Sequence, residues 1–363
     1  MKLVIDPGPT ALGTDHIFLA TSALADDAGL RDAVLRELRA IAASAAYLDW
    51  AAGLAQLQPF EPGSALRGGA LSQVGLLRDR RLCVRVNTVE RDLLLTDGVW
   101  VDARLRVFPF PDESAAIHRY CLARGFVADA DAVIDLATGS GHNLAHFAPD
   151  IPGLGMDINP RALAFFGLNQ RLNGRGAGVA CLNDIRRGFA DIVPFPQARR
   201  PLVLGNMPFG LAPTREILAL TSDGGETGLV LQRAAFEAVA RFRQTPCGRR
   251  ARVVMLGYSV GNAAEDRWEM AELARDIVGA TGLSWTILAG EGLLRVDGQR
   301  IMANPAPLSP ALHAAGGCGL YHRDPAAVRA VYAELAQRLE ARGMPDLSYL
   351  VVEFAPAEQG GLE

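Results

Sequence analysis

Short apolar runs alternate with longer stretches of helical periodicity from Asp131 onward, and this alternation restricts the fold more than any other feature of the 363-residue chain. Each run is long enough for one buried strand. Strands that alternate with helices form a parallel sheet with helices on both faces. The sequence therefore predicts an α/β fold with a doubly wound, mostly parallel, seven-stranded sheet. The predicted strands are 132–136, 154–156, 179–182, 202–204, 253–256, 285–288 and 349–354, and the predicted helices are 160–173, 227–243, 263–281 and 325–342.

The first 113 residues lack this alternation. Apolar residues recur at helical spacing from about 27 to 57, and two prolines follow, which predicts a pair of helices or a helical hairpin. The segments 81–89 and 99–107 each alternate apolar and polar residues, and the Asp97-Gly98 dipeptide between them is typical of a hairpin turn. We therefore expect an N-terminal helical and β-hairpin cap region over 1–113.

A second domain is expected over 114–363. It begins with a helix from Ser114 to Arg124, because the two prolines of the Phe-Pro-Phe-Pro segment before Asp112 cannot continue a central strand. A proline- and glycine-rich stretch later breaks the alternation of strands and helices. This stretch and the helix after it predict a late insertion at about 300–345.

The charge balance argues against a dedicated nucleic-acid partner. The chain carries 36 Lys and Arg residues against 40 Asp and Glu residues, a formal charge of −4, so no basic surplus is present to neutralise phosphates. No apolar stretch reaches the roughly 20 residues of a membrane span, and the N-terminus lacks the layout of a signal peptide. We therefore expect a soluble cytoplasmic protein without a membrane partner.

Neither the cysteines nor the histidines predict a metal site. The five cysteines are odd in number and far apart, which predicts reduced thiols rather than a disulfide framework. His142 and His146 have the i, i+4 spacing of metal ligands, but the sequence shows no third ligand near them. We therefore predict no bound metal.

Glycine-rich and polar segments follow four successive predicted strands. The segment Asp135-Leu-Ala-Thr-Gly-Ser-Gly141 follows the first, and its glycines permit a tight turn and close approach of a ligand. Asp157 ends the second, where a carboxylate can accept hydrogen bonds from both hydroxyls of a ribose. Asn183-Asp184 ends the third, and Asn206-Met-Pro-Phe209 ends the fourth. Because ligands of such sheets bind at the carboxyl ends of the strands, we expect one ligand site there.

These four segments resemble the motifs of class I S-adenosylmethionine-dependent methyltransferases, over about 131–256. The resemblance implies a Rossmann-like fold and S-adenosyl-L-methionine as cofactor. It implies that the loop from Gly139 to Gly141 faces the methionine part, Asp157 the ribose, and Asp184 with Asn183 the adenine. A nicotinamide dehydrogenase is disfavoured, because Leu144 stands where a G-x-G-x-x-G motif has its third glycine. The implied cofactor-binding residues are Asp135, Thr138, Gly139, Gly141, Asp157, Asn183 and Asp184.

The segment Asn206-Met-Pro-Phe is similar to the Asn-Pro-Pro-Tyr/Phe signature of methyltransferases that act on amide or amino nitrogen. An asparagine oxygen and a neighbouring carbonyl can hold a planar NH2 group in line with the methyl group that is transferred. An aromatic ring can stack on the planar acceptor. The implied catalytic residues are therefore Asn206, Pro208 and Phe209.

Two further segments look like the HemK-like branch, the release-factor glutamine methyltransferases. Residues 223–229 resemble its G-G-x-x-G-L stretch, and residues 107–114 resemble its Pro-Arg-Pro-Glu-Thr-Glu stretch. Two positions depart from that branch, because Met207 replaces a proline and Phe110 stands where the branch has arginine. These departures favour another acceptor, a nitrogen of a small molecule or of a peptide side chain.

Three alternatives stay open from the sequence: a protein glutamine methyltransferase, an aminocarboxypropyl transferase or cyclase that uses the same cofactor, and a non-catalytic cofactor-binding module. Tyr258, Tyr321 and His322 are candidates for the acceptor pocket, and they are equally candidates for packing or surface positions. No motif specifies the acceptor or the oligomeric state.

Overall fold

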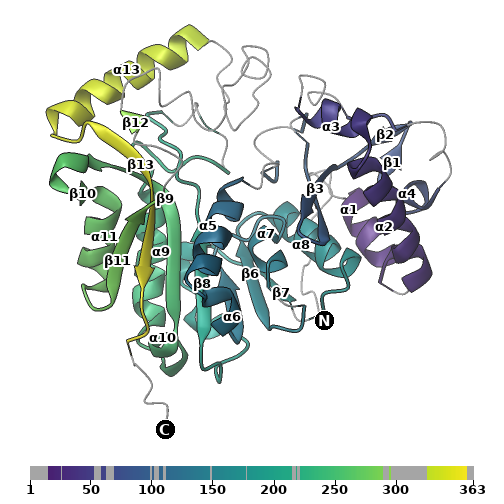
Figure 1. Cartoon of the computed structure of the whole chain (residues 1–363), viewed down its shortest axis with the longest axis horizontal. Helices are drawn as coiled ribbons and strands as arrows, with labels where there is room; N and C mark the ends of the chain where they lie inside the picture. The colour runs from purple at the N-terminus through teal and green to yellow at the C-terminus, as the bar shows by residue number, and fades with distance from the viewer. Residues whose placement is uncertain are drawn as a thin grey trace. The chain divides into compact units, whose positions relative to one another are not determined.

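In the computed structural model of the chain (Figure 1), the residues form two compact units. Unit 1 comprises Met1–Ser114 and Thr138–Leu182, and unit 2 comprises Ala115–Ala137 and Asn183–Glu363. The described residues are 15–25, 27–52, 59–62, 69–98, 100–101, 106–108, 112–147, 149–176, 178–214, 218, 221–288, 294–295 and 325–357.

The N-terminal helices of unit 1 confirm the predicted helical run. Helix α2 starts after Asp27, whose carboxylate accepts a hydrogen bond from the Leu30 backbone N–H at 2.8 Å, an N-cap that satisfies a free donor of the first turn. Its buried face carries Val34, Leu38 and Ile41, whose burial stabilises the fold by about 1.5–3 kcal/mol each. The helices are α1 (Asp15–Ala23), α2 (Ala28–Ala42), α3 (Ala45–Ala52) and α4 (Ala70–Gln73).

The β-hairpin of unit 1 has a different turn from the predicted one. Strands β3 (Arg85–Val89) and β4 (Asp92–Thr96) pair in antiparallel fashion, with Val89 opposite Asp92, so the turn lies at Glu90-Arg91. The prediction of a turn at Asp97-Gly98 is wrong, because the Asp97 side chain is buried and pairs with Arg161 in the helix Pro160–Leu172. Short strands β1 (Leu77–Arg78) and β2 (Arg81–Leu82) also pair. Val99 and residues 102–105 of the predicted second strand lie outside the described residues.

The rest of unit 1 contains a strand–helix–strand motif. Strand β6 (Gly153–Asp157) leads into helix α8 (Pro160–Leu172), and strand β7 (Gly178–Leu182) then pairs with β6 in parallel. Asn159 caps α8, accepting a hydrogen bond from the Arg161 backbone N–H at 2.9 Å. The short helix α7 (His142–Ala145) precedes β6.

Unit 2 holds the other main strands. Strand β5 (Ala132–Asp135) pairs in parallel with β8 (Pro201–Asn206), and β8 pairs in parallel with β9 (Arg252–Asn262). The last strand, β13 (Asp346–Phe354), lies antiparallel between β9 and β11 (Leu283–Ile287). Two short strands, β10 (Arg267–Trp268) and β12 (Leu294–Arg295), add to this sheet.

Helices of unit 2 cover both faces of its strands (Figure 1). A Cβ on Gly257 would meet side chains of α9 and α11, whereas Arg252 stacks on Phe126 of α6 and pairs with the buried Glu353. Residues 252 and 257 point to opposite faces of β9, because side chains alternate along a strand. The helices are α5 (Asp112–Ala123, which begins in unit 1), α6 (Phe126–Asp129), α9 (Val230–Phe242), α10 (Pro246–Arg250), α11 (Glu269–Val278) and α13 (Pro325–Ala341).

The strand order of the main sheet is β11-β13-β9-β8-β5-β6-β7. The chain leaves β5 in one direction and returns to β8 on its other side, which is the reversal that defines a doubly wound fold. The predicted seven-stranded, mostly parallel, Rossmann-like sheet is therefore confirmed, with only β13 running antiparallel to its neighbours among the seven. Among the helices that the structure describes, none is long and apolar enough to cross a membrane.

One predicted helix begins later than expected. Residues 263–265 form a single 3₁₀ turn, and Arg267–Trp268 pairs with the end of β9 before α11 starts at Glu269. The reason is that β9 continues to Asn262 and the chain then turns back to pair with it as β10, which helical periodicity alone does not reveal.

The predicted insertion at 300–345 lies in part outside the described residues, up to residue 324.

Candidate functional site

The glycine-rich loop Thr138–Gly141 lies in unit 1 and leaves open space at one position. Gly139 and Gly141 have φ values of +52° and +91°, in the left-handed region that favours glycine. A Cβ on Gly141 would lie 2.8 Å from the Phe166 ring, so this position has no room for a side chain. A Cβ on Gly139 would meet no atom within 4 Å, so a ligand can approach the backbone there.

The carboxylate of Asp157 organises this loop. Its Oδ2 accepts a hydrogen bond from the Gly139 backbone N–H at 2.9 Å, and its Oδ1 accepts one from the Asn159 backbone N–H at 2.8 Å. Burial raises the pKa of Asp157, and the backbone donors oppose this effect. A carboxylate offers about four lone-pair sites, so each oxygen can also accept a ligand hydroxyl.

The Thr138 hydroxyl is a buried polar group without a protein partner among the described residues. Its side chain is 4% exposed, and its Oγ1 makes no hydrogen bond, whereas its backbone N–H donates to the Met156 carbonyl at 2.8 Å. Buried hydroxyls normally have partners. A polar ligand group at the loop would supply one.

Two apolar side chains that the sequence analysis missed lie at neighbouring strand ends. Ile158 follows Asp157 directly and is 53% exposed, and Leu182 ends β7 and is 54% exposed. Asp157 and Leu182 are register partners, so their strands end side by side. The signal in the sequence was an apolar residue next to each polar strand end. Exposed apolar surface beside a polar loop suits the flat ring of a ligand.

Asn183 and Asp184 are engaged within their own turn in unit 2. The Asn183 amide donates to the Gly188 carbonyl at 2.8 Å. The Asp184 carboxylate forms an ion pair with Arg186 at 2.6 Å, and this hydrogen-bonded arginine lowers the pKa of Asp184. A ligand that binds Asp184 must therefore share its carboxylate with Arg186.

Asp135 and Asn206 end the two strands between which the strand order reverses. Asp135 is fully buried at the end of β5, and Asn206 is half-buried at the end of β8. The backbone N–H of Leu136 donates to the Leu204 carbonyl at 2.9 Å, so the two strand ends lie side by side in unit 2. The carboxyl ends at such a reversal are the usual place for ligands in doubly wound sheets.

Phe209 lies in an aromatic cluster of unit 2. Its ring is 5% exposed, and its centroid lies 5.0 Å from that of Tyr258 and 5.8 Å from that of Tyr349, both edge to face. The Tyr258 hydroxyl donates to the Tyr349 hydroxyl at 2.9 Å. Pro208 is half-buried beside it. An acceptor that stacks on Phe209 would do so within this cluster.

In unit 2, residues 223–229, which resemble the HemK-like branch, pack against the Asn206–Phe209 segment, whereas 109–111 of the other similar segment lie outside the described residues. The Gly210 N–H donates to the Ser222 carbonyl at 2.7 Å, and the Gly224 N–H donates to the Gly210 carbonyl at 2.9 Å. A Cβ on Gly224 would lie 2.7 Å from Phe209 Cα, and a Cβ on Gly228 would overlap the Phe209 carbonyl oxygen. Gly224 and Gly228 are therefore needed for the close approach of the backbone to Phe209.

Helix α13 holds the same loop of unit 2. The buried Tyr332 hydroxyl donates to the Leu211 carbonyl at 2.6 Å, and Arg338 pairs with Glu226 at 3.2 Å. Phe110, Tyr321 and His322 lie outside the described residues.

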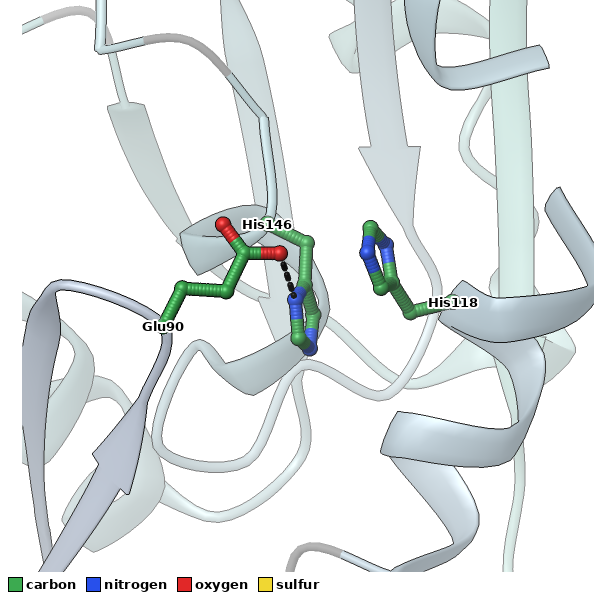
Figure 2. A group of neighbouring side chains, drawn as sticks. All are labelled: Glu90, His118 and His146. Carbon is green, nitrogen blue, oxygen red and sulfur yellow. Dashed lines mark hydrogen bonds and ion pairs between the residues drawn. The ribbon is translucent and has the colours of Figure 1, made fainter. Parts of the chain in front are cut away.

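His146 contacts the turn of the hairpin in unit 1. Its Nδ1 lies 3.4 Å from the Glu90 Oε1 (Figure 2), and its ring centroid lies 4.9 Å from that of His142. Glu90 is at the β3–β4 turn and His146 is the C-cap of α7. Val89 and Leu94 of the hairpin also form a small buried apolar cluster with Ala145 of α7.

No protein-family model matches the chain, and no curated protein matches it. Among solved structures, it is similar to a SAM-dependent methyltransferase from Agrobacterium tumefaciens, with 17% identity, 76% of this chain and 70% of that chain covered, and a TM-score of 0.39. It is also similar to Trm5b from Pyrococcus abyssi (14% identity, 75% and 56% covered, TM-score 0.39) and to geranyl diphosphate methyltransferase in complex with SAM (12%, 67% and 85%, 0.34).

The chain spans only 56% of the length of the Pyrococcus abyssi protein. Likenesses of this degree transfer no activity or substrate to this chain, so the assignment of its fold rests on the topology of the chain itself. The reversal of strand order between β5 and β8, with helices on both faces of the unit 2 strands, shows that the chain has a doubly wound, Rossmann-like α/β fold.

Proposed function

We propose that this protein is a class I S-adenosylmethionine-dependent methyltransferase that acts on a nitrogen atom of a small molecule or of a peptide side chain. The observation that carries the proposal is the arrangement around the glycine-rich loop in unit 1. Open space at Gly139, the buried unpartnered hydroxyl of Thr138 and the carboxylate of Asp157 lie together at the ends of strands.

The residues present suit the cofactor. The Thr138 hydroxyl offers a polar contact to its methionine part, and the free lone pairs of Asp157 accept the ribose hydroxyls. Ile158 and Leu182 offer exposed apolar surface to the adenine ring. The family resemblance adds Asn183 and Asp184 as polar contacts of the adenine. When bound, S-adenosylmethionine supplies an electrophilic methyl carbon on a sulfonium.

Asn206 is proposed to orient the acceptor. Its side-chain oxygen accepts an N–H of the acceptor and directs the nitrogen lone pair at the methyl carbon. The same oxygen stabilises the positive charge that develops on the nitrogen, which loses a proton to water after the transfer. Phe209 is proposed to stack on a planar acceptor, and Pro208 to stiffen the segment between them.

A second candidate is a release-factor-type glutamine methyltransferase. The packing of residues 223–229 against Phe209 favours it, because these residues resemble that branch and Gly224 and Gly228 permit the close contact. Incubation with a release factor and mass spectrometry of its glutamine-containing loop distinguishes this acceptor from a small molecule.

Calorimetry with S-adenosylhomocysteine tests the cofactor site. The wild-type chain should bind it, and Asp157→Ala should lower the affinity about 100-fold, because two hydrogen bonds to a charged group are lost. Asp150→Ala is the matched control, since Asp150 is an exposed carboxylate of the same unit. Lack of binding by the wild-type chain would refute the proposal.

Product analysis tests the reaction. Turnover with an acceptor panel should yield S-adenosylhomocysteine, and Asn206→Ala should lose turnover while keeping its affinity for this product. Formation of methylthioadenosine instead would show transfer of the aminocarboxypropyl group. Binding without any turnover across the panel would favour a non-catalytic module.

A further inference from the structure

Two asparagines of α8 and its C-cap bind strand β4 of the hairpin, in the way that a neighbouring strand would. The Leu95 N–H donates to Asn169 Oδ1 at 2.8 Å, and Asn169 Nδ2 donates back to the Leu95 carbonyl at 2.9 Å. Asn173 makes the same pair of hydrogen bonds with Leu93, at 3.1 and 2.8 Å. Four residues of helix rise about 6.0 Å and two residues of strand about 6.6 Å, so the two spacings match.

Two buried ion pairs flank these asparagines. Asp97 pairs with Arg161 at 2.5 Å, and Asp92 pairs with Arg175 at 2.6 Å. The strand is therefore fixed along the helix from Asp92 to Asp97, at both ends and in the middle. All these contacts lie within unit 1.

The same side chains also bind the glycine-rich loop and the helix after it. Asn169 Nδ2 donates to the Ser140 carbonyl at 2.9 Å, inside the Thr138–Gly141 loop. Arg175 donates to the carbonyls of Ala145 at 2.5 Å and Phe147 at 2.7 Å, at the end of α7. Asn169 thus contacts β4 and the loop through a single amide nitrogen, which has two N–H groups and uses one for each.

We infer that the N-terminal hairpin is a structural part of the cofactor site, and that Asn169 is the positioning residue that couples β4 to the glycine-rich loop. This inference rests on the proposed function. Since Asn169 is 2% exposed and all its donors are used, the loop cannot move away from Asn169 without leaving a buried polar group unpaired. By linkage, cofactor binding must then stabilise the attachment of the hairpin.

Matched variants test the role of Asn169. Asn169→Ala should bind S-adenosylhomocysteine roughly three- to tenfold more weakly, the effect of about one hydrogen bond. Asn173→Ala removes the equivalent bonds to Leu93 and none to the loop, so its affinity should stay within about twofold of the wild type. Calorimetry is done well below the unfolding temperature of each variant. Equal affinities of Asn169→Ala and the wild type would overturn the inference while leaving the proposed function intact.

Amide hydrogen exchange gives a second readout, independent of the measured affinity. The Leu95 N–H donates its hydrogen bond to Asn169 Oδ1. S-adenosylhomocysteine should slow the exchange of this N–H in the wild type and in Asn173→Ala. The slowing should vanish in Asn169→Ala. If the ligand binds to the wild-type chain and leaves Leu95 exchange unchanged, the coupling is refuted. If the ligand does not bind at all, the failure is that of the proposed function.

Discussion

Arg161 and Asp97 form a buried, bidentate ion pair within unit 1. Arg161 Nε donates to Asp97 Oδ2 at 2.7 Å and Arg161 Nη2 donates to Oδ1 at 2.5 Å, and the side chains are 5% and 0% exposed. Asp97 Oδ2 also accepts the Val107 N–H at 2.8 Å. The pair therefore joins the segment after β4 to the first turn of α8, two residues after the cap that contacts Asp157.

Removing one partner of this pair should destabilise the protein strongly. We expect Asp97→Ala to lower the free energy of unfolding by about 3–5 kcal/mol, because Arg161 is left charged and unpaired in the interior. Urea denaturation measures the change. The control is Asp32→Ala, since the Asp32–Arg31 pair is exposed and should contribute at most about 1 kcal/mol. A double variant, Asp97→Leu with Arg161→Met, should recover part of the loss, and equal losses for Asp97→Ala and Asp32→Ala would contradict the prediction.

Cofactor affinity should depend on the ionisation of Asp157. Burial raises the pKa of Asp157 above its usual value of 3.8, and only the ionised carboxylate offers all its lone pairs to ribose hydroxyls. As the pH falls through this raised pKa, the affinity for S-adenosylhomocysteine should fall about tenfold per pH unit below it. Calorimetry between neutral and acidic pH measures the profile.

Asp157→Asn is the control for this pH profile. The ligand titrates in the same way with both proteins, so only the contribution of the carboxylate differs. The variant should bind weakly at all pH values of the series. A wild-type profile parallel to that of Asp157→Asn would show that Asp157 does not receive the ligand.

Gly228→Ala should impair turnover more than cofactor binding. The added methyl group would overlap the Phe209 carbonyl oxygen, so the backbone of the Asn206–Phe209 segment must shift. A shift of this kind can lower the rate of transfer by roughly 100-fold. Affinity for S-adenosylhomocysteine should change little, since the shift falls on the segment proposed to hold the acceptor and not on Gly139 or Asp157. Gly176→Ala, at a position with open space, serves as the control, and equal turnover of both variants would argue against a role for this segment.

Gly167→Ala should stabilise the protein. Gly167 lies in the middle of α8, and a Cβ there would meet no atom within 4 Å outside the helix itself. Alanine in place of a helical glycine is worth about 0.5–1 kcal/mol, because it lowers the conformational entropy of the unfolded chain. Thermal unfolding should show a higher midpoint. A lower midpoint would mean that Phe166 and its neighbours leave less room around α8 than the structure shows.

The sequence predicted the sheet because its signal is local. A buried parallel strand needs only a short apolar run, and each helix of the alternating region shows a helical period of apolar residues. Strands β5 and β8 and helix α8 were therefore found close to their observed bounds. The polar strand ends, from Asp135 to Asn206, were found for the same reason. Their proposed roles toward the cofactor and the acceptor stay predictions.

Contacts between distant parts of the chain were decided only by the tertiary structure. The Asp97-Gly98 dipeptide has the local signature of a turn, but a buried partner at Arg161 outweighs it, and the hairpin turns at Glu90 instead. The bonds of Asn169 join segments 74 residues apart, and no periodicity records such a contact. Local pattern thus determined which elements form, whereas ion pairs and side-chain amides between elements determined that the hairpin is fixed to the glycine-rich loop.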